Sequence, residues 1–162
     1  MVIAELGVYE GDFSRELLEC KPKVLLLVDI WTGTCTSADR NGKNNTVNFD
    51  MFGTYLSLLF IFSPNIHTHI IRGRSDDFLT RIPDDYLDCV YIDSDHSYET
   101  TIQELRLSVP KVKKGGWITG HDYVYLCPGV IQAVDEFIKE TGYKIEYLSE
   151  DGCPSYYIIN NK

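Results

Sequence analysis

Two carboxylates and an imidazole follow an apolar segment in the middle of the chain. The segment Cys89–Ile92 has no side chain that requires water, so it predicts a buried β-strand. Directly after it come Asp93, Asp95 and His96. In open α/β sheets, ligands bind in the crevice outside the carboxyl ends of the strands, so we expect chemistry here. The simpler alternative is two solvated acids and a helix cap, for which Ser97 is the candidate.

A second polar pair, His121 and Asp122, ends the strand expected at 117–119. If this strand neighbours the one before Asp93, then Asp93 and Asp122 converge on one point. Oxygen ligands from adjacent strand ends suit a hard cation such as Mg2+. His121 departs from that preference because imidazole favours softer transition metals. The alternative interpretation is that His121 only packs or forms local hydrogen bonds.

A glycine-containing turn, Glu5-x-Gly7-x-x-x-Gly11, separates the first expected strand from the first expected helix. Glycines allow close approach of the backbone to a ligand, and the helix N-terminus offers free N–H groups. Asp29 ends the second strand, about 20 residues further on, where a carboxylate can accept hydrogen bonds from a ribose. The alternatives are an ordinary tight turn and a strand-end acid that faces water.

A third strand end carries the segment Gly73–Phe78. Ser75 is expected to cap a short helix. Asp76 is expected to lie against the edge of a bound base, with Phe78 behind it.

The scaffold that positions these residues is predicted to be an α/β protein with a doubly wound, mostly parallel sheet. A strand followed by a helix recurs five times, and an antiparallel strand pair ends the chain. The expected strands are 2–6, 23–29, 67–72, 89–92, 117–119, 144–148 and 156–159. The expected longer helices are 13–20, 49–62, 97–112 and 128–141, and residues 32–48 are expected to form a long loop. With no repeat or linker, residues 1–162 are expected to form a single domain.

The composition restricts the function classes. The 162 residues carry a net charge of −9, which disfavours nucleic acid as a partner. No apolar run approaches the roughly 20 residues of a membrane span, and no basic region precedes the first apolar run. The five cysteines include no CxxC pair. A zinc site or a thioredoxin motif therefore has little support, and we expect a reduced, cytoplasmic protein.

Several segments resemble motifs of one enzyme family. Glu5–Ser14 is similar to the first motif of class I S-adenosylmethionine-dependent methyltransferases. Tyr91–Tyr98, Gly115–Tyr123 and Pro128–Val134 resemble the small-molecule O-methyltransferases similar to macrocin O-methyltransferase and its cephalosporin-biosynthesis relatives. The resemblance covers nearly the whole chain and implies a seven-stranded sheet with a reversed last strand. Relatives usually carry helical segments before the first strand, whereas the first motif here begins almost at Met1.

The resemblance also implies where the cofactor lies. Gly7 and Gly11 would face the methionine part of S-adenosylmethionine, Asp29 its ribose, and Asp76 with Phe78 its adenine. The candidate cofactor-binding residues are Glu5, Gly7, Gly11, Asp29, Ser75, Asp76, Phe78 and Asp93.

The same resemblance implies a metal site and a base. In metal-dependent members, magnesium or another divalent cation is held by acids that fall on Asp93, His121 and Asp122, although His121 replaces the usual acid. The histidine of the family falls on His96, which would accept the proton of a substrate hydroxyl. Asp93 and His96 are therefore the candidate catalytic residues.

The first hypothesis is thus a metal-assisted O-methyltransferase that acts on a small hydroxylated molecule or a sugar. It involves no nucleic acid and no membrane, and it allows a homo-oligomer. The alternative is a non-catalytic S-adenosylmethionine-binding module that acts through a protein partner. A nicotinamide-dependent dehydrogenase would share the role of Asp29, but the glycine spacing of that class is missing.

Overall fold

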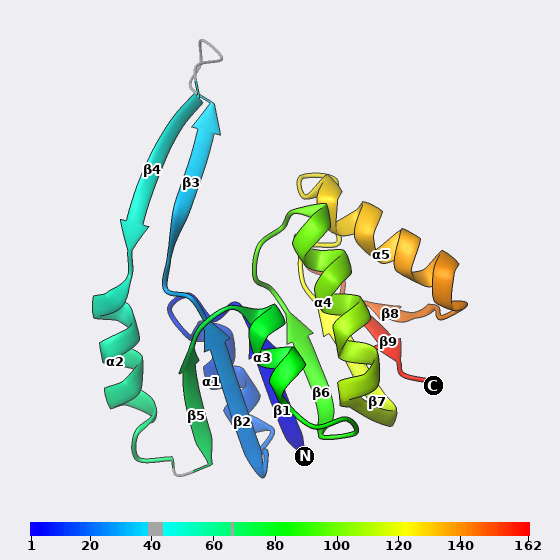
Figure 1. Ribbon diagram of the computed structural model, residues 1–162, viewed down its shortest axis with the longest axis horizontal. Coiled ribbons are helices and arrows are strands. Elements are labelled where there is room, and N and C mark those ends of the chain that lie inside the picture. The colour runs from blue at the N-terminus through cyan, green and yellow to red at the C-terminus, as the bar shows by residue number, and fades with distance from the viewer. Residues whose placement is uncertain (39–43, 66) are drawn as a thin grey trace.

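A seven-stranded sheet forms the centre of the protein, as seen in the computed structural model (Figure 1). The structure describes residues 1–38, 44–65 and 67–162, with side chains described for 1–32, 50–65 and 67–162. The strands are β1 (Val2–Leu6), β2 (Val24–Asp29), β3 (Thr32–Ala38), β4 (Asn44–Asp50), β5 (Thr68–Arg72), β6 (Leu87–Ile92), β7 (Val112–Gly120), β8 (Ile145–Leu148) and β9 (Tyr156–Ile159). The helices are α1 (Asp12–Glu19), α2 (Phe52–Phe62), α3 (Ser75–Arg81), α4 (Tyr98–Lys111) and α5 (Pro128–Thr141).

The sheet order is β5-β2-β1-β6-β7-β9-β8. Strand β9 pairs antiparallel with both β7 and β8, whereas the other pairs are parallel. This confirms the doubly wound, mostly parallel sheet with a C-terminal antiparallel hairpin.

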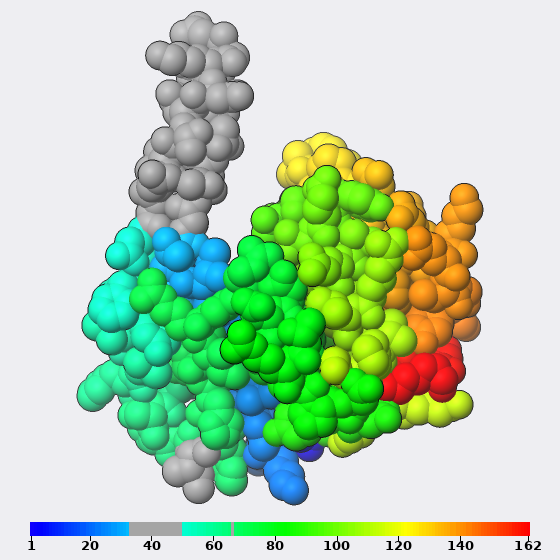
Figure 2. Space-filling model, in the orientation of Figure 1, coloured from blue at the N-terminus to red at the C-terminus, as the bar shows by residue number. Residues whose placement is uncertain are grey.

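Helices cover both faces of the sheet and create two hydrophobic clusters. On one face, α3, α4 and α5 pack Leu79, Leu105 and Phe137 against strand residues such as Leu6. These three helices form the central and right-hand parts of the surface that faces the viewer in Figure 2. On the other face, α1 and α2 pack against the alternate strand residues, among them Leu25. Strands β1 and β2 are covered on both sides, which explains why their sequences are apolar at nearly every position.

The prediction of a long loop at residues 32–48 is wrong. Strands β3 and β4 form a two-stranded antiparallel hairpin there, which extends away from the main sheet (Figure 1). The threonines and Val47 of this segment are β-branched and favour extended backbone, a signal that the abundance of Asn and Gly obscured. Residues 39–43 lie outside the described residues. Because β4 continues to Asp50, helix α2 begins at Phe52 rather than at Phe49.

Strand β7 runs continuously from Val112 to Gly120, so it begins five residues before the strand expected at 117–119 and includes Gly115 and Gly116. The glycines lie in an irregularity of the sheet. Leu87 pairs with Val112 and Cys89 pairs with Trp117, so the register shifts between these two pairs. Gly115 has φ 78 and donates its N–H to the Asn160 carbonyl at 2.7 Å. Glycine therefore permits a β-bulge at this position instead of a chain reversal.

The strand order places the switch point of the sheet between β1 and β6. The chain leaves β1 toward β2 on one side, and it leaves β6 toward β7 on the other. The segments after these two strands therefore separate and leave a crevice at their carboxyl ends, where ligands bind in this architecture. Among the described helices, none is both long enough and apolar enough to cross a membrane.

Candidate active site

Two cavities adjoin at the carboxyl ends of the central strands. The smaller cavity, of about 150 Å3, is lined by residues that include Asp29, Gly73 and Ser75. The larger cavity, of about 440 Å3, is lined by residues that include His96 and Asp122. Gly7 and Ser94 line both, so the two cavities meet at the switch point between β1 and β6.

Gly7 allows the β1–α1 loop to pass directly against the end of β6. Its φ is 88, a left-handed value that favours glycine. A Cβ at this position would lie 1.9 Å from the carbonyl oxygen of Asp93. Gly11 is the N-cap of α1 with φ 76, and its N–H donates to the Val8 carbonyl at 2.8 Å. The expected glycine turn is therefore a tight, sterically restricted wall of the crevice.

Asp29 holds this loop in place. Its Oδ2 accepts the backbone N–H groups of Val8 and Tyr9 at 2.8 and 2.9 Å, and its Oδ1 accepts that of Trp31 at 2.7 Å. The carboxylate also lines the smaller cavity. Since each carboxylate oxygen can accept more than one hydrogen bond, Asp29 can bind a hydroxyl while it positions the loop.

The residues after β5 differ from the expectation. Arg74, not Ser75, is the N-cap of α3, and the Ser75 hydroxyl instead bonds the carboxylate of Glu104. Asp76 forms an ion pair with Arg74, with Oδ2 2.8 Å from Nη2, and this interaction lowers the pKa of Asp76. Phe78 is buried in the hydrophobic core with α4 and α5 rather than in the wall of either cavity. The structure thus brings Ser75 to the smaller cavity, whereas neither Asp76 nor Phe78 lines either of the two cavities.

Glu5 lies beneath the larger cavity and is almost fully buried. The hydroxyl of Ser14 donates a hydrogen bond to Glu5 Oε2 at 2.5 Å. Burial raises the pKa of Glu5 to about 8, and the negative charges of Asp93 and Asp29 add to this shift. At neutral pH the side chain therefore carries its proton and fixes β1 to α1 without adding a charge to the crevice.

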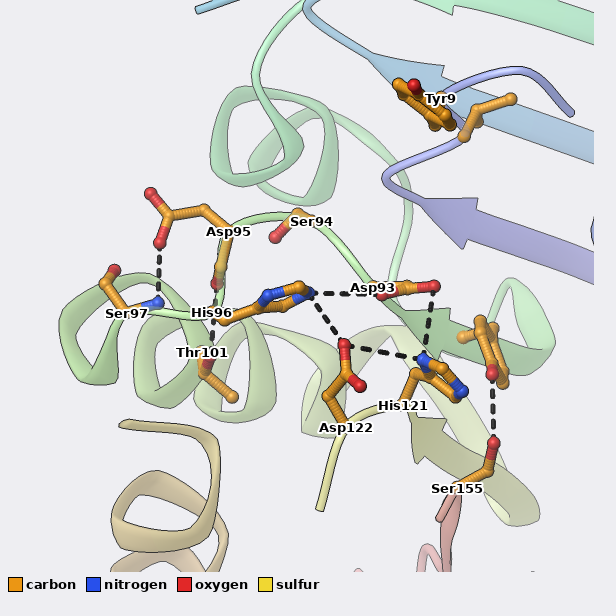
Figure 3. A network of polar contacts seen from close by, with 12 residues as sticks. Tyr9, Asp93, Ser94, Asp95, His96, Ser97, Thr101, His121, Asp122 and Ser155 are labelled. Atoms are coloured by element: carbon orange, nitrogen blue, oxygen red, sulfur yellow. Dashed lines mark hydrogen bonds and ion pairs between the residues drawn. The ribbon is translucent and has the colours of Figure 1, made fainter. Parts of the chain in front are cut away.

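Four side chains from the ends of β6 and β7 form a connected polar cluster (Figure 3). His96 Nε2 lies 3.4 Å from Asp93 Oδ1 and 3.0 Å from Asp122 Oδ2. His121 Nδ1 lies 3.8 Å from Asp93 Oδ2 and 3.5 Å from Asp122 Oδ2. The expected convergence of Asp93 and Asp122 therefore occurs, and the imidazoles lie between the carboxylates.

The charge of this cluster favours a protonated imidazole. The hydrogen bond to Asp93 and the negative charge of Asp122 raise the pKa of His96, whereas partial burial opposes the shift. Asp122 adopts a left-handed φ of 57, which turns the chain sharply after β7. The thiol of Cys153 also forms a hydrogen bond with Asp122. Asp122 is therefore the residue that two imidazoles and a thiol share.

Asp95 has a structural role at the start of α4. Its Oδ1 accepts the Ser97 N–H at 2.6 Å, and its carbonyl accepts the Thr101 hydroxyl at 3.4 Å (Figure 3). Ser97 is the N-cap of α4, because its hydroxyl accepts the Thr100 N–H at 3.3 Å. The assignment of the cap to Ser97 is confirmed.

Glu104 was missed by the sequence analysis. It is fully buried in α4, and its Oε1 and Oε2 accept the Ser94 hydroxyl at 2.7 and 2.8 Å. Burial raises its pKa to about 7. The helical spacing of the sequence could have shown that Glu104 is buried. It lies one residue from Leu105 and four from Ser108, on the face of α4 that packs against the sheet.

Phe13 and Tyr91 were also missed. Their rings stack with centroids 4.1 Å apart, and Phe13 lines the larger cavity. The Tyr91 hydroxyl lies 3.0 Å from the Ser155 hydroxyl. Phe13 lies in the helix expected at 13–20, and no local pattern shows which strand residue its ring meets.

Two donor sets could hold a metal ion within the described part of the chain. One comprises Asp93, His121 and Asp122, and the other comprises His96, Asp122 and Cys127. In each set, one ligand atom from every residue lies within 4.8 Å of the others. The first set is the one expected from the resemblance. Its two carboxylates and one imidazole fit a divalent cation, although the imidazole is not a donor that Mg2+ prefers.

A family model described as a methyltransferase domain matches residues 4–123. The chain therefore belongs to this family and is a class I S-adenosylmethionine-dependent methyltransferase, as the motifs indicated. The curated protein R132 of Acanthamoeba polyphaga mimivirus, which is described as uncharacterized, is 29% identical over 164 residues. The match covers 94% of this chain and 67% of that protein.

Three solved structures share the fold. The O-methyltransferase NovP matches with a TM-score of 0.72 and 21% identity, over 99% of this chain and 72% of that chain. CalS11, a calicheamicin methyltransferase, matches with a TM-score of 0.69 and 18% identity, over 98% and 71% of the two chains. An rRNA methylase from Streptococcus thermophilus matches with a TM-score of 0.64 and 9% identity, over 99% and 87%. At these identities the similarity demonstrates the fold and not the methyl acceptor.

Proposed function

We propose that this methyltransferase methylates an oxygen atom of a small hydroxylated molecule or a sugar, with His96 as the general base. The observation that carries the proposal is the position of His96. Its imidazole lies in the wall of the larger cavity and contacts both Asp93 and Asp122. The smaller cavity would hold the nucleoside part of the cofactor, with Asp29 at the ribose and the Gly7–Gly11 loop at the methionine part.

The chemistry follows from the placement of these groups. When bound, S-adenosylmethionine supplies a methyl group on a positively charged sulfur, and cleavage of the carbon–sulfur bond leaves the neutral thioether of S-adenosylhomocysteine. His96 accepts the proton of the substrate hydroxyl, which leaves the oxygen free to form the new bond to carbon. Asp93 and Asp122 stabilise the resulting imidazolium, since both carboxylates contact Nε2. Glu5, being protonated, adds no negative charge against the deprotonated oxygen.

Asp93, His121 and Asp122 would hold a divalent cation in this site. A bound cation would supply Lewis acidity that lowers the pKa of the substrate hydroxyl. Support comes from the convergence of the three donors within 4.8 Å. A cation bound to Asp93 and Asp122 would also offset their negative charge. The two carboxylates would then hold the proton on His96 less strongly, and the neutral imidazole that acts as the base would be favoured.

A small acceptor is favoured over RNA by the charge of the surface. The net charge is −9, and such a surface repels phosphate groups. Lysines gather at positions 111, 113 and 114, and two of them are already paired, Lys111 with Asp84 and Lys113 with Asp88, each at 2.7 Å. The fold shared with NovP and CalS11 is compatible with a small acceptor.

A methyl-transfer assay tests the proposal. Purified protein is incubated with methyl-labelled S-adenosylmethionine and a panel of sugars and phenols, with and without divalent cations. We expect transfer by the wild type, retained affinity for S-adenosylhomocysteine in His96→Ala, and loss of turnover in that variant. His67→Ala, an exposed histidine before β5, is the matched control. Tight cofactor binding without transfer to any acceptor would instead support a non-catalytic binding module.

The pH profile gives a second measurement of the same role. Because the pKa of His96 is raised above its ordinary value of 6.5, its basic form accumulates only at higher pH. Turnover without added cation should therefore rise through an apparent pKa above 6.5. A profile that is flat across this range would remove His96 as the base.

A further inference from the structure

The second donor set differs chemically from the one that the family resemblance implies. It joins the imidazole of His96, the carboxylate of Asp122 and the thiol of Cys127. These residues come from three separate segments: the β6–α4 loop, the residue pair after β7, and the N-cap of α5. Nitrogen, oxygen and sulfur donors together suit Zn2+ and related transition metals, whereas Mg2+ selects oxygen donors.

The geometry of this set is suitable for a tetrahedral ion. The three donor atoms lie within 4.8 Å of one another, and the pair His96 Nε2 and Asp122 Oδ2 is 3.0 Å apart. Zinc–ligand bonds of about 2.0–2.3 Å place tetrahedral ligand atoms roughly 3.3–3.8 Å apart, so adjustments of about 1 Å or less suffice. Three protein ligands leave the fourth position open to water.

The surroundings hold the ligands and let an ion enter. The Cys127 backbone is fixed at the start of α5, where its N–H donates to the Val124 carbonyl at 2.9 Å. The thiol of Cys153 and His121 Nδ1 both contact Asp122, which orients the carboxylate as the neighbours of metal ligands commonly do. His96 and Asp122 line the larger cavity, and the His96 side chain is 47% exposed.

We propose that His96, Asp122 and Cys127 form a binding site for Zn2+ or a similar thiol-binding transition metal, and that its occupancy inhibits methyl transfer. An imidazole that ligates a metal through one ring nitrogen keeps its proton on the other, so it has no free lone pair with which to act as a base. The ion would also bind the carboxylate of Asp122, which is a ligand in the first donor set as well. Coordination by Cys127 releases the thiol proton to solvent, with no oxidation or reduction.

Metal binding in this proposal is independent of the proposed function, whereas inhibition rests on it, because only a catalytic His96 can be blocked. The two parts are therefore tested with different measurements. Binding is followed with Co2+, which replaces Zn2+ and gives a thiolate-to-cobalt charge-transfer band when sulfur is a ligand. The full chain is used throughout, without cofactor or acceptor.

We expect the wild type to show this band with Co2+ and to lose it on addition of Zn2+. Cys127→Ser should lack the band and should bind Zn2+ at least tenfold more weakly in competition with a chromophoric chelator. Cys20→Ser, at the exposed end of α1, and Cys153→Ser, beside Asp122, should keep the band. Thermal unfolding without metal checks that each variant is folded, and His96→Gln provides a second variant that should also weaken Zn2+ binding.

A wild-type protein without the band, or a band that persists in folded Cys127→Ser, would overturn the site. Inhibition is then measured by adding Zn2+ to the methyl-transfer assay. Wild-type turnover should fall, and Cys127→Ser should need at least tenfold more Zn2+ for the same effect. Equal Zn2+ sensitivity of both proteins would overturn the inhibitory role. If no acceptor is methylated while the band behaves as expected, the proposed function fails and the metal site stands.

Discussion

The Ser94 hydroxyl lies 2.7 and 2.8 Å from the two carboxylate oxygens of Glu104, which is fully buried in α4. The same carboxylate also bonds the hydroxyl of Ser75. Ser94 follows β6 and Ser75 follows β5, and both line the smaller cavity. One buried acid thus joins the β6–α4 loop to the first residue of α3 in the wall of the proposed nucleoside site.

Glu104 should make the stability of the protein depend on pH. Burial raises its pKa from 4.5 to about 7, so the folded state holds the proton more tightly than the unfolded state. Its contribution to stability is fully present below about pH 4.5 and is lost as the pH rises through about 7. Glutamine cannot ionise, so Glu104→Gln should not lose stability in this way. The melting temperature of the variant minus that of the wild type should therefore increase between pH 5 and pH 8.

The matched control for this experiment is Glu99→Gln, an exposed acid in the first turn of the same helix. Its difference from the wild type should stay nearly constant over the same pH range. Glu5, another buried acid with a raised pKa, is present in all three proteins, so its own pH dependence cancels in the comparison. Parallel curves for Glu104→Gln and the wild type would contradict the assignment.

Asp29→Ala should weaken binding of S-adenosylhomocysteine. The substitution removes an acceptor at the proposed ribose position and frees the N–H groups of Val8 and Tyr9, which position the loop. Loss of a hydrogen bond to a charged group costs roughly 1.5–3 kcal/mol, which is about 10- to 100-fold in affinity. Calorimetry of both proteins measures the effect, with the exposed Asp77→Ala as control. Unchanged affinity in Asp29→Ala would exclude the ribose role.

The sequence specifies the central part of the fold because local signals there agree with the tertiary structure. Strand β2 is apolar at nearly every position and is covered on both faces, and α5 shows a clear stripe between its start at Pro128 and Gly142. The sequence of the hairpin β3–β4 carries no comparable apolar pattern, since its two strands pair only with each other and not with the main sheet. Its pattern of Thr, Asn and Gly is compatible with either a loop or a strand.

The site was predictable where its residues follow strands in sequence, and not where distant segments determine their partners. Asp93 and Asp122 converge because β6 and β7 are neighbours, which the topology implied. The partner of Ser75 could not be inferred, because Glu104 reaches it from a helix about 30 residues away by sequence number. Cys127 was likewise unassigned, since its proximity to His96 depends on how α5 packs against α4.

His121→Asp should change the metal preference of the first donor set. The substitution replaces an imidazole with a carboxylate, so that all three residues at this position offer oxygen atoms to a cation. Because Mg2+ prefers oxygen ligands, its affinity should increase about tenfold or more relative to the wild type. Equilibrium dialysis with Mg2+ measures the change, and the exposed His67→Asp controls for the added charge. Equal Mg2+ affinity in His121→Asp and the wild type would argue against a cation between Asp93 and Asp122.

Helix α2 presents a surface that we expect a second copy of the chain to cover. It contains no charged residue, and its exposed apolar side chains include Leu56, Ile61 and Phe60, which is 82% exposed. Each copy carries a net charge of −9 and so repels the other, and contact through an uncharged helix brings no further like charges together.

Phe60→Asp should therefore weaken self-association. Burial of a phenylalanine side chain is worth about 1.5–3 kcal/mol, so the substitution should raise the dimer dissociation constant at least tenfold. Light scattering coupled to size-exclusion chromatography measures the mass as a function of concentration. Tyr147→Asp, an exposed aromatic residue on β8 at the other end of the sheet, is the control. A wild type that is monomeric at all concentrations would refute the expected dimer.

Gly7→Ala should destabilise the protein strongly. The added Cβ would lie 1.9 Å from the Asp93 carbonyl oxygen, and φ at this position is 88, so both sterics and backbone conformation oppose the substitution. The Asp93 N–H donates to the Leu6 carbonyl at 2.7 Å, which means that the clash separates the ends of β1 and β6. We expect a loss of more than about 3 kcal/mol in the free energy of unfolding, measured by urea denaturation.

The control is Gly53→Ala in α2, where a Cβ meets nothing within 4 Å. This substitution should instead stabilise the protein by about 0.5–1 kcal/mol. Since the same clash moves Asp93, Gly7→Ala protein that remains folded should also bind S-adenosylhomocysteine more weakly. Wild-type stability in Gly7→Ala would show that the β1–α1 loop does not pass against β6 as described.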